Sequence, residues 1–481
     1  MTRHRNTAAC DACRARKVKA TLGGLPDLHR VLQKWLLYII TANAASKASR
    51  LTSPVLGARW TPRKKRGPKN RYIQTLRDEL DGMSGGRPSL GDFAPPEIIH
   101  QLIADWFGRI HPVAPILHQD RFMQQLRECL VSGNGTPSFL LLVASLCAAT
   151  MASLRRRRHL YGSVTVESCL DFAERLGLWS PSAEITVERS LAVYNFGSAV
   201  HHEHGIESPL AHRLVTETAM SVRFLMHQAI ETMCFADAQI LKRLYWLVYA
   251  GHCTYDMYGW QLLFIRQAHD HTHTLIPLEI SDAQLMNDGE PSSPDHIGAE
   301  YSYVPGLNAL SRLYMVWQSS QAVATQSIAN LQAHIERTHR LAEDLSPELS
   351  WKGNDHVSED FGFDVQMVNL KITQLHIRSN LLEQMNTVAR SEGLLITPHA
   401  IIEERHRVVD ELLDILYHMP TEVFDANGHS IIPKIRDIGS ALLDELRTGS
   451  QGRTLQASVN LDRLLAKLQN LDLRPANATP F

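Results

Sequence analysis

The chain has 481 residues, of which 44% are hydrophobic and 21% are charged, a balance typical of a globular protein with two or three domains. Seven cysteines, an odd number within the first 253 residues, do not form the pattern of a disulfide-stapled secreted protein. The net charge is −1, but residues 1–80 carry 18 Lys and Arg against 4 Asp and Glu, and the remainder carries 31 against 46. A basic head on an acidic body predicts a polyanion partner for the head alone.

The N-terminus is charged from Arg3 and lacks the apolar core of a signal peptide, so the sequence predicts a protein that is not secreted. The uncharged stretch 35–46 is about 12 residues long, whereas a membrane-spanning helix needs about 20. Five cysteines lie in mostly apolar helical stretches, and we expect buried thiols in a reducing compartment at Cys129, Cys147, Cys169, Cys234 and Cys253.

Residues 10–19 read C-D-A-C-R-A-R-K-V-K and form the first chemically informative stretch. Cys10 and Cys13 are spaced so that both thiolates can bind one tetrahedral zinc ion. Four cations follow on a short expected helix, where we expect contacts to DNA phosphates or guanine edges: Arg14, Arg16, Lys17 and Lys19. Among these we favour Arg16 and Lys19 as the base or phosphate contacts.

This order of residues resembles the first half of the fungal binuclear zinc-cluster motif, in which six cysteines hold two zinc ions. The resemblance implies a nuclear protein that binds paired CGG-like triplets in double-stranded DNA. The third cysteine of the pattern is replaced by Ala20, and the next cysteine is Cys129. Two thiolates cannot close a structural zinc site alone, because such sites need four ligands. His4 and His29 are the nearby nitrogens, at a spacing that fits no zinc finger we can derive.

Residues 21–60 read as an insert unrelated to the motif that occupies residues 1–20. Sequence similar to the fungal zinc-cluster family resumes at Thr61 with T-P-R-K-K-R-G-P-K-N-R. A retained intron or a misjoined exon would produce this pattern, so whether residues 21–60 are a genuine part of the protein is left open.

Residues 61–92 are expected to form a basic linker with a short amphipathic helix. Six cations around a Gly-Pro turn predict an exposed arm for nuclear import and for contact with DNA: Arg63, Lys64, Lys65, Arg66, Lys69 and Arg71. Residues 72–83 then place Ile73, Leu76, Leu80 and Met83 at a/d spacing. This covers less than two heptads, so a homodimer through a coiled coil is left open.

Residues 93–470 are expected to form an all-α effector domain, because long helical patterns dominate and strand patterns are nearly absent. An apolar face runs from Ile98 to Ile110. The residues F-x-x-I-H-P-x-x-P-I-L-H at 107–118 resemble the opening of the fungal-specific transcription factor middle homology domain. His111 and His118 lie beside prolines at a helix–loop junction, where a structural role is favoured over a catalytic one.

Residues 138–154 are almost wholly apolar and predict a buried helix, after which four arginines at 155–158 would cap its carbonyls and complement its dipole. Residues 165–235 predict paired antiparallel helices. The segment 238–250, with a basic pair before an aromatic pair, resembles a second signature of the middle domain. The loop that follows lacks the family's G-R-P.

Two histidine-rich passages are candidate metal sites. His201-His202-Glu203-His204 fails the H-E-x-x-H pattern, because Ile206 stands where the second histidine is needed. His269, His271 and His273 alternate and would share one face of a strand, but a polar surface loop is favoured. The chain also lacks the nucleotide-binding and hydrolase motifs, so we expect no catalytic residues and no enzyme.

The C-terminal half predicts helices at 308–345, 365–390, 399–417 and 435–471, with a mobile surface segment at 345–365 and a disordered tail at 471–481. The stretch S-E-D-F-G-F-D at 358–364 is either an acidic activation segment or, as we favour, a solvated loop.

Together these patterns favour a DNA-binding transcription regulator of a fungal metabolic or secondary-metabolite gene set. A small-molecule inducer or coregulator is an open partner, and no membrane is expected. The alternative is a helical interaction protein that has lost specific DNA binding and acts through its partners.

Overall fold

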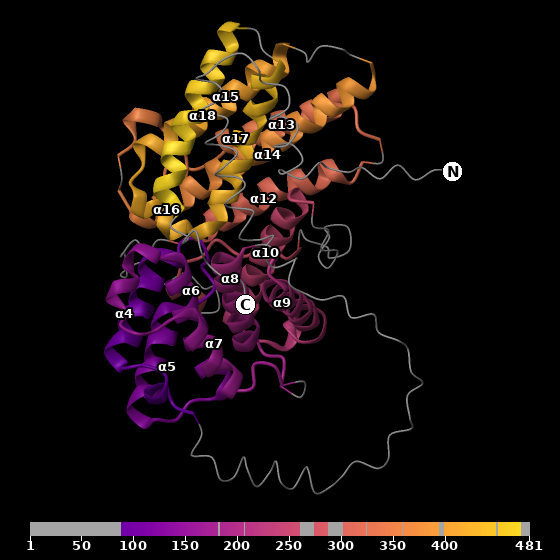
Figure 1. Ribbon diagram of the computed structural model, residues 1–481. Coiled ribbons are helices and arrows are strands. Elements are labelled where there is room, and N and C mark those ends of the chain that lie inside the picture. The colour runs from indigo at the N-terminus through magenta and orange to yellow at the C-terminus, as the bar shows by residue number, and fades with distance from the viewer. Residues whose placement is uncertain are drawn as a thin grey trace, which may run out of the picture.

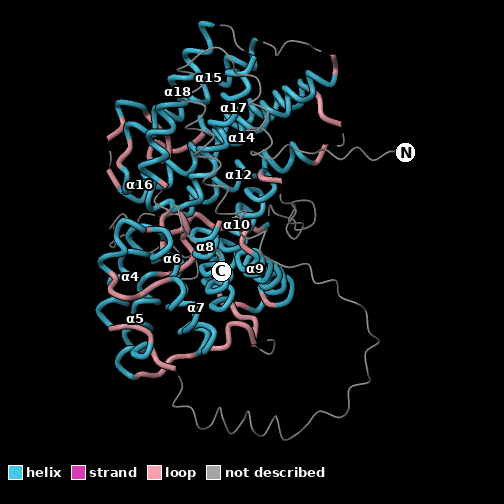
Figure 2. The backbone as a smooth tube through the Cα atoms, in the orientation of Figure 1, coloured by secondary structure: helices cyan, strands magenta, loops and turns pink. Residues whose placement is uncertain are grey.

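The computed structural model describes residues 88–180, 183–205, 207–259, 274–286, 302–323, 325–357, 359–393, 399–448 and 451–472. Throughout these ranges the ordered elements are helices, and none is a strand (Figure 2). The expected all-α class is therefore confirmed. Figure 1 shows the helices α4 to α9 in one half of the molecule and α13 to α18 in the other, with α10 and α12 where the halves meet.

The first half contains six α-helices and several short turns of helix. Its elements are η2 (Leu90–Asp92), α4 (Pro96–Asp105), η3 (Trp106–Ile110), α5 (Gln119–Ser132), α6 (Pro137–Ser153), η4 (Arg155–Leu160), α7 (Val166–Arg175), α8 (Val187–His204), α9 (Pro209–Gln228) and η5 (Ile230–Thr232). Side chains of Thr136, Thr186 and Ser208 accept hydrogen bonds from the first turns of α6, α8 and α9, which fixes where these helices begin.

Helix α6 forms the core of this half. Every residue from Phe139 to Ser153 is buried, and α6 packs against α4, α7 and α8. A helix that is apolar on all sides must be surrounded by protein, as the sequence predicted for residues 138–154.

The predicted apolar face at 98–110 is confirmed, but its last turn is a π-helix rather than a continuation of α4. In η3 the carbonyl of Trp106 accepts from the backbone N–H of His111 at 2.9 Å, five residues on. Trp106 and Phe107 are buried there, and the turn leads into the loop 111–118.

The second half is built around one long helix. Its elements, counted from the helix that joins the halves, are α10 (Phe235–Met257), α11 (Asp282–Met286), α12 (Val304–Gln321), α13 (Ile328–Glu343), η7 (Gly353–Asp355), α14 (Phe361–Ser391), α15 (His399–His418), α16 (Thr421–Asn427), η8 (Gly428–Ser430), α17 (Ile431–Thr448) and α18 (Gln451–Leu471). Helix α14 packs against α12, α13, α15, α16 and α17, so it is the centre of this half.

Two expected helices are each divided in two. Residues 308–345 form α12 and α13, separated at Ala322 and restarted by Ser327, whose side chain accepts from Asn330 N at 3.2 Å. Residues 435–471 fall in α17 and α18. As one helix, residues 308–345 would be about 57 Å long and could not pack both ends on α14. The periodicity was correct, but it does not reveal where a helix folds back.

The favoured expectation of a solvated loop at 358–364 is wrong from Phe361 onward, and the activation-segment interpretation stays a prediction. From Phe361 these residues are the first turn of α14, capped by Asp360, whose Oδ1 accepts from Phe363 N at 2.9 Å. Asp364 is buried and accepts from His356 Nε2 at 2.8 Å. The segment 345–365, expected to be mobile, is bonded to α15, since Trp351 Nε1 donates to Asp414 Oδ2 at 2.6 Å.

Candidate functional site

The site residues expected from the sequence lie outside the described residues. They are the two thiols Cys10 and Cys13, the DNA-contacting cations Arg14, Arg16, Lys17 and Lys19, and the basic arm Arg63, Lys64, Lys65, Arg66, Lys69 and Arg71. These assignments stay predictions. Within the described ranges, no group of three or more His, Cys, Asp or Glu side chains is placed to hold a metal ion. The described helical domain therefore adds no metal-binding group of its own to the two thiolates.

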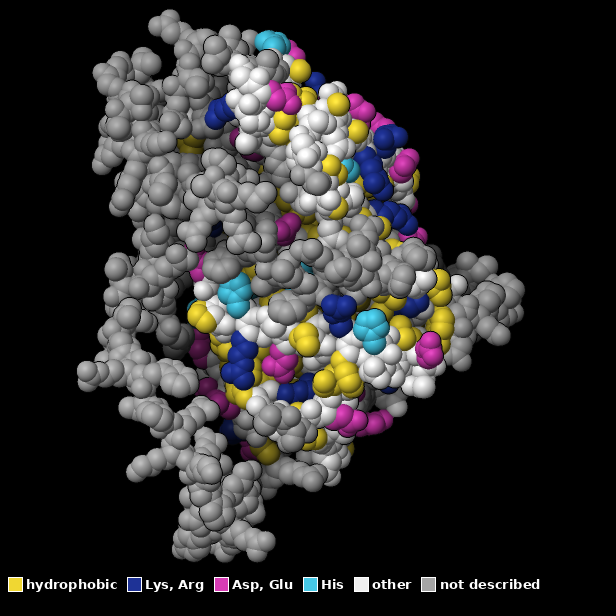
Figure 3. All heavy atoms as spheres, turned by 90° about the vertical axis from the view of Figure 1, so that its right-hand side faces the viewer, with side chains coloured by type: hydrophobic (Ala, Val, Ile, Leu, Met, Phe, Trp, Pro, Cys, Tyr) yellow, Lys and Arg dark blue, Asp and Glu magenta, His cyan; other side chains and the backbone are white. Residues whose placement is uncertain are grey.

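The described face of the domain that Figure 3 shows mixes charges of both signs. Lys and Arg lie beside Asp and Glu, with hydrophobic side chains between them. The part of this face that the structure describes presents no stripe of one sign, unlike the basic arm of the head.

Two of the four arginines after α6 cap its carbonyls as the sequence predicted, and all four join elements. Arg155 Nε donates to Ala152 O at 3.3 Å and Arg158 Nε to Met151 O at 2.7 Å, which caps the last carbonyls of α6. Both arginines also pair with Glu203 on α8.

The other two arginines of this turn reach further. Arg156 Nε lies 2.9 Å from Asp425 Oδ2 on α16, and its Nη2 donates to Asn470 O on α18. Arg157 Nη2 donates to both oxygens of Asp105 at 3.0 Å. One short turn thus ties α4 and α8 of the first half to α16 and α18 of the second.

Asp105 is the centre of its own polar cluster. Besides Arg157, it accepts from Tyr161 Oη at 2.8 Å and from Gln101 Nε2 at 3.2 Å. Burial opposes ionisation, but the hydrogen bonds from Tyr161, Gln101 and Arg157 outweigh it and lower the pKa of Asp105. The carboxylate is held ionised as a structural link.

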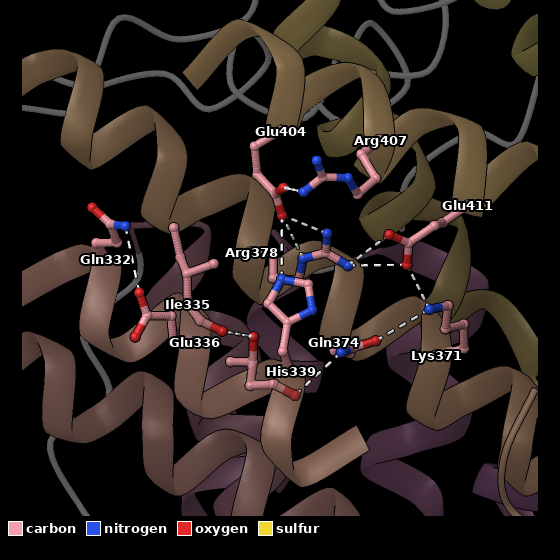
Figure 4. Close-up of polar contacts among 11 residues, drawn as sticks. Gln332, Ile335, Glu336, His339, Lys371, Gln374, Arg378, Glu404, Arg407 and Glu411 are labelled. Atoms are coloured by element: carbon pink, nitrogen blue, oxygen red, sulfur yellow. Dashed lines mark hydrogen bonds and ion pairs between the residues drawn. The ribbon is translucent and has the colours of Figure 1, made fainter. Parts of the chain in front are cut away.

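A second cluster surrounds Arg378 in the middle of α14 (Figure 4). Its side chain is 0% exposed, yet every edge of the guanidinium has a partner. Nε and Nη2 donate to Glu404 Oε1 at 3.2 and 2.5 Å, and Nη1 donates to Glu411 at 3.0 and 3.1 Å. Lys371 also donates to Glu411, at 2.6 Å. The cluster clamps α15 onto α14, and His339 brings α13 into contact with Glu404 at 3.3 Å.

His118 has the structural role that the sequence favoured. It is the N-cap of α5: its Nδ1 accepts from Arg121 N at 3.2 Å, and its Nε2 lies 3.0 Å from Asp282 O. Since Nδ1 faces a donor and Nε2 faces a carbonyl, the neutral ring with the proton on Nε2 satisfies both contacts.

His111 is buried among aromatic rings rather than exposed in a site. Its ring centroid lies 5.4 Å from that of Trp106 and 5.5 Å from that of Phe107. Burial, together with Arg243 and His118, lowers the pKa of His111 to about 3. The ring is therefore neutral at physiological pH.

The loop 111–118 is itself buried, and side chains from two distant helices satisfy its carbonyls. Gln366 Nε2 on α14 donates to Pro112 O at 2.8 Å, and Arg243 Nη1 on α10 donates to Pro115 O at 3.1 Å. The expected signature at 107–118 is thus a buried junction at which α10 and α14 meet. Sequence reasoning did not single out Arg243 or Arg378. The available signal was a cation inside an otherwise apolar helix, which requires a buried partner.

The segment 274–286 lies across α10 and α12 beside this loop. Trp246 Nε1 donates to Leu275 O at 2.9 Å, Gln239 Oε1 accepts from Leu278 N at 3.0 Å, and Asn308 Nδ2 donates to Pro277 O at 3.1 Å. Its α11 places Asp282 Oδ1 3.8 Å from Arg243 Nη1.

The histidine-rich end of α8 contains a buried serine–histidine pair. Ser153 Oγ lies 3.2 Å from His202 Nδ1, and both residues are buried. Burial, with His201 and Arg155, lowers the pKa of His202 well below its usual value. The pair lies beside a small pocket between the two halves, whose lining is Ala152, Ser153, Arg155, Phe424, Asp425, Gly428, Ile432 and Leu471. No carboxylate contact to the His202 ring is seen among the described residues, so the pair lacks the third member of a catalytic triad.

The expectation of buried thiols is confirmed for four of the five cysteines. Cys129, Cys147, Cys169 and Cys253 are buried and free, whereas Cys234, at the start of α10, is exposed. Burial raises the pKa of all four buried thiols, so none is a reactive thiolate.

The described helices differ from membrane-spanning segments in length and hydropathy. No single one of them is long and apolar enough to cross a membrane, and one sharply bent pair, Gln119–Ser132 with Pro137–Ser153, meets the test only when taken together.

Comparison with known proteins gives one partial similarity. The chain is 24% identical over 194 residues to cutinase transcription factor 1 alpha of Fusarium vanettenii. The match covers 39% of this chain and 20% of that protein's length. No protein-family profile matches the chain, and no solved structure matches it.

Proposed function

We propose that this chain is a transcription regulator of a fungal metabolic or secondary-metabolite gene set that acts in the nucleus and binds DNA through its basic head. The observation that supports this is the partial similarity to cutinase transcription factor 1 alpha, in a chain that also carries the stretch 10–19. That relative is named as a transcription factor, which also favours a regulator over an enzyme.

In its finer form, the proposal assigns DNA contact to the cations of the head. Arg14, Arg16, Lys17 and Lys19 contact phosphates and the guanines of CGG-like triplets, and the arm 63–71 adds further phosphate contacts. Bound zinc would fix the turn that precedes these cations. Cys10 and Cys13 supply only two of the four ligands that such a site needs, so the residues present do not complete it.

The helical domain, residues 93–470, is assigned the effector role. Arg156 pairs with Asp425 of α16 across the two halves, and the cluster at Arg378 connects helices within the second half, so the domain is a continuous body rather than a flexible tether. Such a body can hold the residues of a coregulator-binding surface in fixed relative positions.

A second candidate is a helical interaction protein that regulates without specific DNA binding. Ala20 supports it, because the zinc cluster lacks its third cysteine and Cys129 is the next. Sequencing the transcript across codons 15–65 decides whether this head is genuine. An mRNA that restores four cysteines before Thr61 favours the regulator that binds DNA directly, whereas an mRNA that encodes Ala20 and the insert favours the interaction protein.

Chromatin immunoprecipitation with the tagged full chain tests the proposed function itself. We expect enrichment at promoters of a limited gene set, with CGG-like triplets under the peaks. Enrichment at promoters without a shared sequence would identify the interaction protein instead. A chain that is absent from chromatin would contradict the regulator that binds DNA directly.

A further inference from the structure

Arg243 and Arg378 are both buried arginines, but their surroundings differ. Arg378 is 0% exposed and donates to the carboxylates of Glu404 and Glu411 through all three of its nitrogens. Arg243 is 1% exposed, and its one hydrogen bond, from Nη1, goes to the neutral carbonyl of Pro115. Within the described part of the chain, Nε and Nη2 of Arg243 have no hydrogen-bond partner.

The nearest carboxylate does not satisfy Arg243. Asp282 Oδ1 lies 3.8 Å from Nη1, beyond hydrogen-bonding distance, and it does not contact the Nε/Nη2 edge. A buried cation with unmade hydrogen bonds is unfavourable for folding. A neutral amide makes a comparable contact in the same loop, since Gln366 Nε2 donates to Pro112 O.

The unused edge of Arg243 has the geometry of an anion receptor. Nε and Nη2 are the parallel pair of donors that bind a carboxylate or a phosphate in a bidentate manner. His111 belongs to the loop 111–118 whose Pro115 carbonyl Arg243 binds, and its Nδ1 also has no partner among the described residues. The side chain of Asp282, whose Oδ1 lies 3.8 Å from Arg243 Nη1, is itself 28% exposed.

We propose that Arg243 is the recognition group of a site for a small anion, a carboxylate or a phosphate, with His111 beside it. In the free protein Asp282 partly neutralises the guanidinium, and it repels an incoming anion. The anion would bind at the edge of the Arg243 guanidinium formed by Nε and Nη2. Only the use of this site by an inducer rests on the proposed function, since the site itself stands on the local geometry.

Binding of an anion at this site would affect the loop 111–118. Asp282 O contacts His118 Nε2 at 3.0 Å, and Arg243 holds Pro115 O at 3.1 Å, so both neighbours of the anion are bonded to that loop. Gln366 connects the same loop to α14. An anion at Arg243 thus has a direct structural route from α10 to the central helix of the second half.

Thermal unfolding of the full chain with inorganic phosphate, and separately with succinate, tests the proposal at ionic strength matched with chloride. Four proteins are compared: wild type, Arg243→Met, Asp282→Asn and Arg312→Met. Arg312 is the matched control, because it also lies 3.8 Å from a carboxylate of the same segment, Glu279, but is 53% exposed. Comparison with the control variant removes the general stabilising effect of such salts.

We expect a saturable rise in Tm, of about 3 °C or more near saturation, in wild type and Arg312→Met with at least one of the two anions. Arg243→Met should lose it, and Asp282→Asn should reach half of its full shift at a concentration about 3- to 10-fold lower, because a repelling charge is gone. A response to phosphate alone or succinate alone identifies the anion class.

The proposal is overturned if Arg243→Met responds like wild type, or if neither anion exceeds matched chloride, in which case Arg243 contacts ordered water only. Should Arg243→Met fail to fold, Asp282→Asn decides the matter: an unchanged anion concentration at half-shift contradicts the proposal. Since no arm of this experiment involves DNA, its failure is distinct from failure of the proposed regulator function.

Discussion

Arg378 Nη1 on α14 donates to both carboxylate oxygens of Glu411 on α15, at 3.1 and 3.0 Å, in a cluster that leaves the arginine fully buried. Glu404 completes the clamp from about two turns earlier in α15. A buried ion pair of this kind contributes little more to folding stability than well-packed apolar side chains would. Removing one partner, however, leaves the remaining buried charges uncompensated, which is destabilising.

Arg378→Met is therefore expected to destabilise the protein strongly. Glu404 and Glu411 would lose the partner between them, which costs about 3 kcal/mol or more in the free energy of unfolding. Arg407 is the control, since it also pairs with Glu404 but is 61% exposed, and Arg407→Met should cost less than about 1 kcal/mol. Urea unfolding measures both, and equal losses in the two variants would show that the clamp does not stabilise the fold.

Arg243→Met is expected to behave in the opposite way in the absence of anions. Replacing an incompletely paired buried charge by an apolar side chain of similar length should leave the free energy of unfolding unchanged or raise it, since the carbonyl of Pro115 loses only one donor. Urea unfolding beside Arg378→Met makes the comparison direct. A loss as large as that of Arg378→Met would mean that the fold depends on the Arg243 charge.

The buried histidines predict a dependence of stability on pH. The pKa of His111 is lowered to about 3 and that of His252 to about 4, while an unfolded histidine titrates near 6.5. Between these values the unfolded chain binds protons that the folded chain does not, so stability falls as pH decreases from about 6.5 toward 3. His111→Phe should lessen the slope by about 1.4 kcal/mol per pH unit.

Denaturation midpoints at several values of pH between about 4 and 7 measure that slope. His100→Phe is a suitable control, because His100 lies on α4 outside the buried group of histidines. A His111→Phe profile parallel to that of wild type would contradict the neutral, buried state of the ring.

Glu404 predicts a second acid transition at lower pH. Burial opposes its ionisation, but contacts with His339, Arg378 and Arg407 outweigh it and lower the pKa to about 2. A carboxylate with a lowered folded pKa stabilises the protein above its unfolded pKa of about 4.5, and this contribution is lost as pH falls toward 2. Glu404→Gln should lose stability at neutral pH and show a flatter profile below about pH 4.5. A variant profile that keeps the slope of wild type would contradict this role.

Gly428 is expected to tolerate no side chain. Its φ of 66° and ψ of −165° lie in a region that is nearly restricted to glycine, and an added Cβ would lie 2.6 Å from His202 Cε1. Gly133 has a similar φ of 68°, but its ψ is 2° and open space surrounds it, so Gly133→Ala measures the cost of an ordinary left-handed backbone, about 1 kcal/mol. Gly428→Ala should cost at least about 1 kcal/mol more in urea unfolding, because its ψ and the contact with His202 both add to that cost. Equal costs would show that neither the backbone at Gly428 nor the contact with His202 resists a side chain.

The sequence predicted the fold where a pattern is local. The unbroken apolar run of α6 and the apolar face from Ile98 to Ile110 on α4 and η3 predict which residues are buried, because helical periodicity alone places each of them. The breaks at Ala322 and before Gln451 were missed, since they depend on how α13 and α18 pack against α14 and α17.

The partners of charged residues could not be predicted for the same reason. Arg378 meets Glu404 and Glu411 across two helices, and Arg156 meets Asp425 more than 200 residues away in the chain. The capping of α6 by Arg155 and Arg158 is a local interaction, and it was predicted. The head, with Cys10 and Cys13, lies outside the described residues and rests on the sequence.

Fluorescence anisotropy with the full chain and two duplexes of equal length, one with paired CGG triplets and one with those triplets scrambled, tests the central claim most directly. Measured at about 50 and 200 mM salt, the CGG duplex should bind at least about 10-fold more tightly, and Lys19→Ala with Arg16→Ala should remove the difference. Equal, steeply salt-dependent binding of both duplexes, unchanged by these substitutions, would contradict a head that reads DNA sequence.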